Sequence, residues 1–364
     1  MSRLLLISLG QLNGHILEAV ARSGAFDEIL VAGRNPARGL RKTNQARIGA
    51  AIQGHYPAIR FIELDVNKSS APRMLREAAP DIALAASSML PWWRLDRLNG
   101  SRAKAARAVP FAGWIACHLA PMLAVRGAWA DSGLGVPWVG ASYPDVVNAV
   151  LHRSGPGPVC GVGNVDEVIP KVRFAVAAET GCDPSAVSVH LIAQHALEYF
   201  VYREAETARQ DAPPLMLRAE LDGRDVSDVA LRAILSPFPI PYELDFNLLT
   251  ASSALKLLPA LAGHAPVHTH VPAPNGLPGG YPVRVEAGRV SLDLPADWAV
   301  EDAVASNVAS LPWDGLQSIE SDGTVVFTEA TSRALFALAG RHYDSLAPDG
   351  AAAMARELVA AAAG

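Results

Sequence analysis

Apolar and polar residues alternate along the first half of the chain in a pattern typical of strands and helices in turn. Short apolar runs are separated by segments in which apolar residues recur at the spacing of one helix face. The predicted strands are 4–9, 28–32, 59–66 and 82–87, and the predicted helices are 16–22, 41–53 and 71–79. Apolar strands that alternate with amphipathic helices form a parallel sheet covered on both faces. The order therefore predicts a doubly wound α/β domain that binds its ligands at the carboxyl ends of the strands.

The pattern changes after residue 155. A helix over 103–126, broken near Pro121, and a strand over 136–142 extend the first sheet and complete a domain of residues 1–155. Beyond it, the Ala287-Gly288 pair lies between two alternating segments and predicts a hairpin turn. The other predicted elements are helices 166–180, 251–262 and 350–363, strands 187–193 and 321–328, a β-rich region 279–295 and a polar, proline-interrupted segment 211–214. We therefore expect a second, α+β substrate domain over residues 156–364.

Composition narrows the classes of partner. The 364 residues are 50% hydrophobic and 18% charged with a net charge of −5, so the chain offers no basic footprint for nucleic acid or an anionic membrane. Three widely spaced cysteines indicate neither a zinc site nor a disulfide framework, which fits a reducing cytoplasm. The apolar stretch 108–125 contains prolines and a histidine, so we expect a buried helix suited to a homodimer interface and no transmembrane segment. The expected partner is a small-molecule substrate.

The stretch "ISLGQLNGH" follows the first strand and opens the first helix, where a Rossmann-type domain places its dinucleotide-binding turn. The three glycine positions of that turn are Ser8, Gly10 and Asn13 here, so only the middle glycine is kept. Free amides at the helix N-terminus can still bind a phosphate. The predicted cofactor-binding residues are Gly10, Gln11, Leu12 and Asn13, and the alternative is an ordinary strand–helix turn.

The end of the second strand indicates which dinucleotide would bind. "VAGRNPAR" places Arg34 and Asn35, with Arg38 one turn later, where an NAD enzyme has the acid that binds the ribose diol. An arginine at this place pairs with a 2′-phosphate, so the sequence favours NADP over NAD. A solvated basic turn is the alternative. Ser87 and Ser88, at the end of the fourth strand, are further cofactor-binding candidates.

Candidate chemistry lies in the second half. Asn164 and Asp166 lie where a turn enters a helix, and His195 follows an alternating strand. A histidine held by a carboxylate has its charged form favoured and can donate a proton to a carbonyl, although a structural histidine is the alternative. In "SSMLPWWRLDR", a loop after the fourth strand brings Arg94 or Arg97 to an anionic substrate group. The grouped His264, His268 and His270 are interpreted as packing or surface residues, so no metal is expected.

These segments resemble the lactate/malate dehydrogenase superfamily and its relatives, the NAD-dependent family-four glycoside hydrolases. The resemblance rests on "GVGNVDEVIPKVRFAVAAETG" followed by a strand and a histidine, on "ASYPDVVNAVL", on "LLTASSALKLL" and on "PVHTHVPAPNGLPGGYPVRV". It implies that His195 is the acid/base, that Asp166 is its partner, that Tyr143 lies beside the nicotinamide and that Thr250 belongs to the substrate helix. "ILVAGRN" and "IRFIELDVNK" resemble the nucleotide domain of saccharopine-dehydrogenase-type reductases, which places Asp65 and Asn67 near the adenine and supports NADP.

Several positions depart from the superfamily's pattern. The substrate-carboxylate arginine is replaced by Ile169, which cannot bind a carboxylate in the usual way and so puts a simple 2-oxo acid in doubt. Tyr143 stands where the family has Asn, and Ala196 and Leu197 stand where it has glycines. Gly163 stands where the glycosidases have a metal-binding cysteine, which disfavours their metal-dependent mechanism.

The sequence therefore predicts an NADP-dependent oxidoreductase that reduces a carbonyl or oxidises an alcohol of a small metabolite in an interdomain cleft. One alternative is redox-assisted elimination or epimerisation of a sugar-like substrate. The other is a non-catalytic NADP-binding protein.

Overall fold

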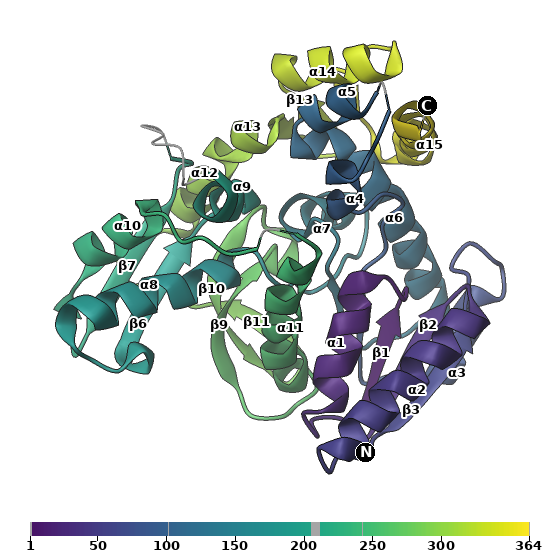
Figure 1. Cartoon of the computed structure of the whole chain (residues 1–364), viewed down its shortest axis with the longest axis horizontal. Coiled ribbons are helices and arrows are strands. Elements are labelled where there is room, and N and C mark those ends of the chain that lie inside the picture. Colours follow the sequence, from purple (N-terminus) through teal and green to yellow (C-terminus); the bar gives the residue numbers. More distant parts are fainter. Residues whose placement is uncertain (1, 101, 205–211, 242, 364) are drawn as a thin grey trace.

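The computed structural model describes residues 2–100, 102–204, 212–241 and 243–363, and a five-stranded parallel sheet organises its N-terminal part (Figure 1). The strand order is β3-β2-β1-β4-β5, with all pairs parallel. The strands are β1 (Arg3–Ile7), β2 (Glu28–Gly33), β3 (Ala58–Glu63), β4 (Ile82–Ala85) and β5 (Trp138–Gly140). This order confirms the predicted doubly wound, Rossmann-type fold.

Alternate side chains of these strands enter two different cores, because successive residues of a strand point to opposite faces. Leu5 and Leu30 pack with α3 (Ala71–Ala78), α6 (Ile115–Ser132) and α7 (Pro144–Arg153). Leu4 and Ile29 pack on the other face with α1 (Gln11–Ala21), α2 (Pro36–Ile52) and α11 (Asn247–Leu261). Helices therefore cover both faces of the sheet, as the apolar strands require.

The predicted helix over 103–126 is interrupted, but not at Pro121. Helix α5 (Ala103–Ala108) ends at extended Val109, because the residue before a proline avoids the helical region, and a 3₁₀ turn at Phe111–Trp114 leads into α6. Pro121 lies inside α6. A proline at this position leaves the carbonyl of Cys117 without its usual helical donor. The amide of Met89 donates to that carbonyl instead, at 2.8 Å, so the helix runs through its proline.

The apolar stretch that the sequence suggests for a homodimer interface packs largely inside the chain itself. Ile115, Leu119 and Met122 are fully buried in the chain's own core, against α3 and the C-terminal helix α15 (Ala351–Ala363). These residues are therefore used by the chain's own core, and the homodimer stays a prediction.

Small antiparallel sheets form the second part of the molecule. Its strands are β6 (Val187–Ile192), β7 (Met216–Leu221) and β8 (Arg224–Asp225) in one sheet, and β9 (Val267–Pro272), β10 (Gly280–Glu286) and β11 (Arg289–Leu292) in the other. Its helices are α8 (Val165–Thr180), α9 (His195–Tyr199), α10 (Ser227–Leu235) and α12 (Val300–Ala309). The predicted hairpin turn is confirmed, since Ala287 and Gly288 connect β10 to β11 with φ of 45° and 80°. Residue 211 of the predicted polar segment lies outside the described residues.

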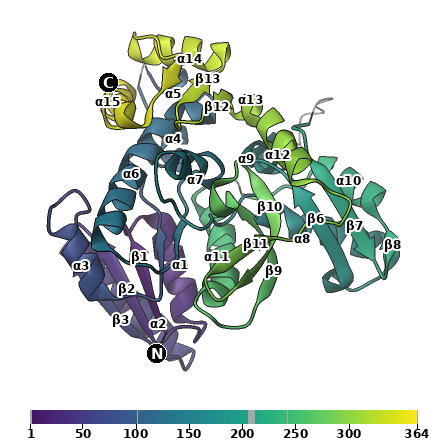
Figure 2. The ribbon, with the colours of Figure 1, turned by 180° about the vertical axis from the view of Figure 1, so that it is seen from behind.

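The expected second domain, residues 156–364, does not pack as one block. Its last part comprises α13 (Leu311–Asp314), β12 (Leu316–Ile319), β13 (Val325–Phe327), α14 (Glu329–Ala339), β14 (Ser345–Leu346) and α15. Leu316, Leu335 and Leu358 share a core with Trp114 and Leu119 of the first domain. Figures 1 and 2 both show α14 and α15 lying over α5 and α6. The chain therefore returns to its first domain at the end, while the boundary near residue 155 stays a prediction.

Across the part of the chain that the structure describes, no helix combines the length and apolar character that a membrane crossing needs.

Candidate functional site

A cavity of about 840 Å³ opens at the carboxyl ends of β1 and β4. These two strands are neighbours, with Ile7 paired to Ala85, but the chain leaves them toward opposite edges of the sheet. Such a switch point is where doubly wound sheets bind ligands. The β1–α1 turn, the loop after β4, and residues of α6, α8, α9, α11 and α13 line this cavity, so it lies between the two halves of the molecule.

The β1–α1 turn presents backbone to this cavity. Gly10 is the N-cap of α1 and no side chain caps the helix, whose first turn carries no acidic residue. A Cβ built on Gly10 would meet nothing within 4 Å. Gly10, Gln11 and Leu12, which are predicted to bind the cofactor, line the cavity, and the first amides of a helix have no intrahelical acceptor. The turn is therefore an open, positively polarised end.

Asn13 does not line the cavity, and its side chain instead bonds the backbone of the β1–α1 turn. Its fully buried amide nitrogen donates to the carbonyl of Ile7 at 2.9 Å and to that of Ser8 at 2.6 Å. Ser8 has a φ of 73°, a region that L-residues rarely adopt. Asn13 therefore fixes the turn that the absent glycines would otherwise form, and its predicted contact with a cofactor is not what the structure shows.

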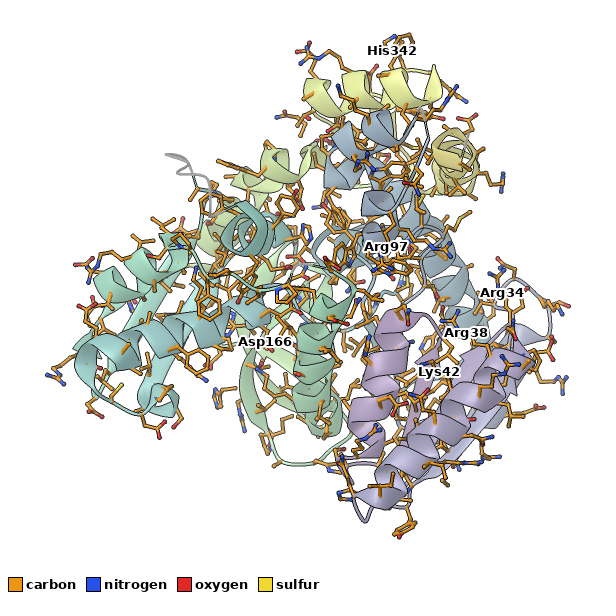
Figure 3. All side chains as sticks on the ribbon, in the orientation of Figure 1. Arg34, Arg38, Lys42, Arg97, Asp166 and His342 are labelled. Atoms are coloured by element: carbon orange, nitrogen blue, oxygen red, sulfur yellow. The ribbon has the colours of Figure 1, made fainter. Side chains whose placement is uncertain are left out.

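The basic residues after β2 divide into two roles. Arg34 and Arg38 line the cavity, and Figure 3 labels Arg34, which precedes α2, with Arg38 and Lys42, which lie on it. Asn35 instead caps α2, because its side-chain oxygen accepts the amide of Arg38 at 2.9 Å. Asp65 accepts the amide of Asn67 at 3.1 Å, and neither of these two residues lines the cavity.

His195 is the first residue of α9 and lines the cavity from the side opposite the turn. Its backbone amide donates to Asp145 at 3.1 Å. Its ring Nδ1 bonds Oδ2 of Asp314 at 2.8 Å, and the imidazole stacks on Phe111 with 4.5 Å between ring centroids. A buried imidazole is thus held by a carboxylate, as expected of the site, but the carboxylate comes from α13.

The predicted His195–Asp166 contact is wrong. Asp166 Oδ1 accepts Nζ of Lys256 at 2.5 Å and Oγ1 of Thr269 at 3.1 Å. The first turn of α8 directs this carboxylate toward α11 and β9, away from α9, and it does not line the cavity. Asp166 therefore ties α8 to two neighbouring elements.

Asp314 was missed because nothing in "LPWDG" marks it as functional. It lies 119 residues after His195 and reaches the site only because α13 packs beside α9. Its Oδ2 also accepts the hydroxyl of Tyr143 at 2.8 Å and the side-chain amide of Gln194 at 3.0 Å. Three donors thus meet on one buried carboxylate oxygen.

These contacts set the charge of the pair. Burial alone would lower the pKa of His195, but Asp314, with Glu198 and Asp145 nearby, raises it to about 9. Burial would raise the pKa of Asp314, but His195, Gln194 and Tyr143 hold it below its ordinary range. At neutral pH the pair is therefore an imidazolium beside a carboxylate.

Asp145 forms a second support. Its carboxylate accepts the side-chain amide of Asn164 as well as the amide of His195. Burial raises the pKa of Asp145 to about 6, against the opposing effect of His195. Asn164 lines the cavity as predicted, so this contact joins the start of α8 to the start of α9.

The wall formed by α8, α9 and α11 is acidic. Glu167 and Glu198 line it, and Thr250 Oγ1 donates to Glu167 at 2.6 Å. Burial, followed by repulsion from Glu198, raises the pKa of Glu167 well above its ordinary value. Among the described residues these three helices bring no Lys or Arg to the cavity, and Ile169 is buried in the α8–β6 core.

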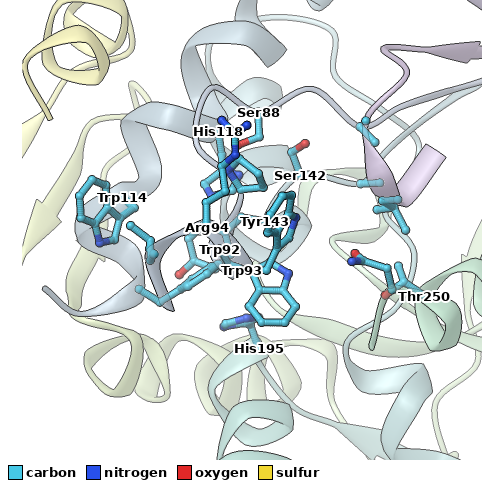
Figure 4. A pocket seen from close by; sticks show the side chains of 18 of the residues that line it. Ser88, Trp92, Trp93, Arg94, Trp114, His118, Ser142, Tyr143, His195 and Thr250 are labelled. Carbon is cyan, nitrogen blue, oxygen red and sulfur yellow. The ribbon is translucent and has the colours of Figure 1, made fainter. Parts of the chain in front are cut away.

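The loop after β4 forms the opposite wall. Ser88 and Arg94 line the cavity, and Figure 4 shows both with Tyr143 and His195. Arg94 lies on α4 (Trp92–Asp96), with its guanidinium 5.7 Å from the ring centroid of Trp93. Ser87 does not line the cavity, although its carbonyl accepts the hydroxyl of Ser142 at 2.8 Å and so fixes the loop to the end of β5.

The grouped histidines make separate contacts. Nδ1 of His268 bonds Asp293 at 2.6 Å, and Nε2 of His270 accepts the amide of Leu191 at 3.1 Å. No group of three potential metal ligands lies together anywhere in residues 2–100, 102–204, 212–241 and 243–363.

No protein-family model and no curated protein matches the sequence. Solved structures nevertheless share its fold. A lactate dehydrogenase from a Medee basin deep-sea metagenome library aligns with a TM-score of 0.55 and 11% identity over 86% of this chain and 96% of its own. The Plasmodium falciparum malate dehydrogenase aligns at 0.54 with 11% identity over 86% and 97%. The Cryptosporidium parvum lactate dehydrogenase, solved with lactic acid and nicotinamide adenine dinucleotide, aligns at 0.51 with 14% identity over 86% and 98%.

At these identities the likeness shows that the chain has the fold of the lactate/malate dehydrogenases. None of these three structures bears on the resemblance to the glycoside hydrolases or to saccharopine-type reductases, which stays a prediction.

Proposed function

We propose that this protein is an NADP-dependent oxidoreductase that reduces a carbonyl, or oxidises an alcohol, of a small metabolite. One observation carries the proposal: a single cavity is lined by an open helix N-terminus, by two arginines after β2 and by the His195–Asp314 pair. The helix N-terminus suits the pyrophosphate of the dinucleotide, and the two arginines suit the 2′-phosphate of NADP. The His195–Asp314 pair suits the proton transfer that accompanies hydride transfer. The fold shared with nicotinamide-dependent dehydrogenases supports the same reading.

The residues present fit a dinucleotide. The Gly10 turn leaves space above its backbone, and the amides of Gln11 and Leu12 would bind the pyrophosphate there. Arg34 and Arg38 would bind a 2′-phosphate. When bound, the nicotinamide would supply or accept the hydride.

His195 would handle the proton. Its Nδ1 is bound by Asp314, which orients the ring and leaves Nε2 to donate to a carbonyl oxygen of the substrate. Because its pKa is raised to about 9, the imidazolium is the main form at neutral pH, and a proton is available when reduction begins. The neutral ring that remains would be the base for the reverse reaction.

The choice between NADP and NAD can be measured by titrating the protein with NADPH and NADH and following nicotinamide fluorescence. We expect Arg34→Ala and Arg38→Ala each to weaken NADPH binding by about tenfold, the effect of a lost charge-assisted hydrogen bond, and to leave NADH binding nearly unchanged. Lys42→Ala, on the same helix but outside the cavity, is the matched control. Equal losses for both nucleotides would refute a 2′-phosphate site.

The reaction can be tested with a panel of carbonyl and alcohol metabolites. We expect NADPH consumed in equal amount to product, and His195→Asn to lower kcat by about a hundredfold or more while NADPH still binds. Turnover without net change in NADPH would replace the proposal with redox-assisted elimination or epimerisation. Tight nucleotide binding without turnover, unaffected by His195→Asn, would leave only a nucleotide-binding protein.

A further inference from the structure

Three polar side-chain atoms of residues that line the cavity have no hydrogen-bond partner within the part of the chain that the structure describes. They are Oγ of Ser88, Nε1 of Trp114 and Nδ1 of His118, and each is buried. Trp114 is 1% exposed and His118 is 5% exposed, and all three residues line the cavity. Buried polar groups in native proteins are paired with few exceptions, so three orphans on one wall indicate that a ligand supplies their partner.

The fold of α6 and of the loop after β4 brings these three residues to the same cavity. Trp114 ends the 3₁₀ turn and is the N-cap of α6, and His118 lies four residues later inside that helix. The loop that carries Ser88 is fastened to α6 beside His118, because the amide of Met89 donates to the carbonyl of Cys117 at 2.8 Å. This contact exists because Pro121 cannot use that carbonyl. Figure 4 draws Ser88 and His118 at the end of the cavity away from His195.

The chemistry of the wall is that of a donor set. An indole N–H can only donate, a hydroxyl can donate, and a neutral imidazole can donate from whichever nitrogen carries its proton. Arg94, which lines the same wall, adds a positive charge. The wall formed by α8, α9 and α11 carries the carboxyl groups of Glu167 and Glu198 and, among the described residues, no Lys or Arg. An anion is therefore favoured at the side of the cavity that carries these donors and Arg94.

We propose that Ser88, Trp114 and His118, with Arg94, form a subsite for an oxyanion group of the substrate, either a carboxylate or a phosphate. This inference rests on the proposed oxidoreductase function and names the substrate class: a metabolite whose acidic group binds against α6 while its carbonyl faces His195. Ile169 lies in the α8–β6 core and does not line the cavity, so the acidic group would be bound by residues other than that position.

The state of His118 agrees with this geometry. Burial, followed by repulsion from the positive charge of His195, lowers the pKa of His118 to about 4. Its ring lies 5.9 Å from Phe111, which also stacks on His195, so the two imidazoles flank one aromatic ring. A neutral His118 binds an oxyanion by hydrogen bonding and does not compete with His195 as the proton donor.

The test uses malonate and inorganic phosphate as probes on the full chain labelled with ¹⁵N. The indole N–H resonance of Trp114 is identified by its loss in Trp114→Phe, and Trp129, which is outside the cavity, is the internal control. We expect one anion to shift the Trp114 resonance in a saturable way, neutral malonamide to leave it unchanged, and Trp129 not to respond. Tighter binding of phosphate or of malonate identifies the acidic group.

Variants complete the test. His118→Gln and Ser88→Ala should each weaken anion binding by about tenfold, and NADPH binding measured on the His118→Gln sample should be retained. Anion binding that is equal in wild type and both variants, or no response of Trp114, would overturn the subsite. A response of Trp114 without any NADPH binding would overturn the oxidoreductase and leave an anion site, so the two failures are distinguishable.

Discussion

Asp314 is the residue on which the site's charge depends. One oxygen of its carboxylate accepts from His195, Tyr143 and Gln194, which come from three different segments of the chain. A buried carboxylate with several donors stays ionised, and it keeps the neighbouring imidazole protonated. The two groups should therefore be tested together.

The variant Asp314→Asn should lower the pKa of His195 well below about 9, because burial is then opposed only by Glu198 and Asp145. Histidine NMR titration measures this shift. Asp166→Asn is the matched control and should leave the pKa of His195 unchanged, since Asp166 binds Lys256.

The same shift has a stability consequence. A pKa that is higher in the folded than in the unfolded state contributes stability that is fully present below pH 6.5 and is lost as the pH rises through about 9. Wild type should therefore lose part of its advantage over Asp314→Asn across this window in thermal melts. A constant difference between the two proteins from pH 6 to 10 would contradict it.

Asn13 gives a second prediction for a single residue. Asn13→Ala leaves the carbonyls of Ile7 and Ser8 without their side-chain donor, so we expect a loss of about 1–3 kcal/mol in the free energy of unfolding. Urea denaturation measures it, with exposed Asn99→Ala as the control. An unchanged midpoint would show that the turn does not depend on this side chain.

Residues of the site were predictable where they follow a strand. Gly10, Arg34 and Ser88 stand after β1, β2 and β4, and the carboxyl ends of neighbouring parallel strands meet at one edge. His195 stood out in the same way after β6. Asp314 and His118 do not follow a strand and could not be predicted in this way. Asp314 lies on the short helix α13 near the end of the chain, and His118 lies inside the apolar helix α6.

At the scale of elements, hydrophobic periodicity located the strands of the parallel sheet because β1, β2, β4 and β5 are buried on both faces, while the edge strand β3 alternates between buried and exposed residues over its first three positions. It misplaced the interruption in the 103–126 helix. Periodicity does not show that the amide of Met89, from another segment, donates to the Cys117 carbonyl that Pro121 leaves free. Long-range hydrogen bonds of this kind carry no local pattern. A proline therefore indicates a break in a helix only where no other segment donates a hydrogen bond to the carbonyl that the proline leaves free.

The β10–β11 hairpin allows a stabilising change. Ala287 is held at a φ of 45°, which costs an L-residue energy that glycine does not pay. We expect Ala287→Gly to raise the free energy of unfolding by about 0.5–1 kcal/mol, measured by urea denaturation. Gly288→Ala, at a φ of 80°, should do the reverse, and a loss of stability in both variants would contradict the proposed strain.

At the scale of the whole molecule, the hydrophobic core of the first domain is completed by residues from the C-terminal end of the chain. Residues of β12, α14 and α15 fill the side of α6 that faces away from the sheet, so a fragment of residues 1–155 would expose apolar side chains. We expect that fragment alone to lack a cooperative thermal transition by circular dichroism, and co-expression with residues 311–363 to restore one. A cooperative transition of the fragment alone would show that the sheet and its own helices suffice.

The return of the chain to its beginning also governs when the protein becomes competent. A ribosome releases the histidine of α9 well before the aspartate of α13, and in that interval the imidazole lacks the carboxylate to which its Nδ1 is bonded in the folded chain. The His195–Asp314 pair thus forms only after the C-terminal segment has been synthesised and has docked, so an interrupted translation product that ends before residue 314 would lack this pair whatever else it had folded.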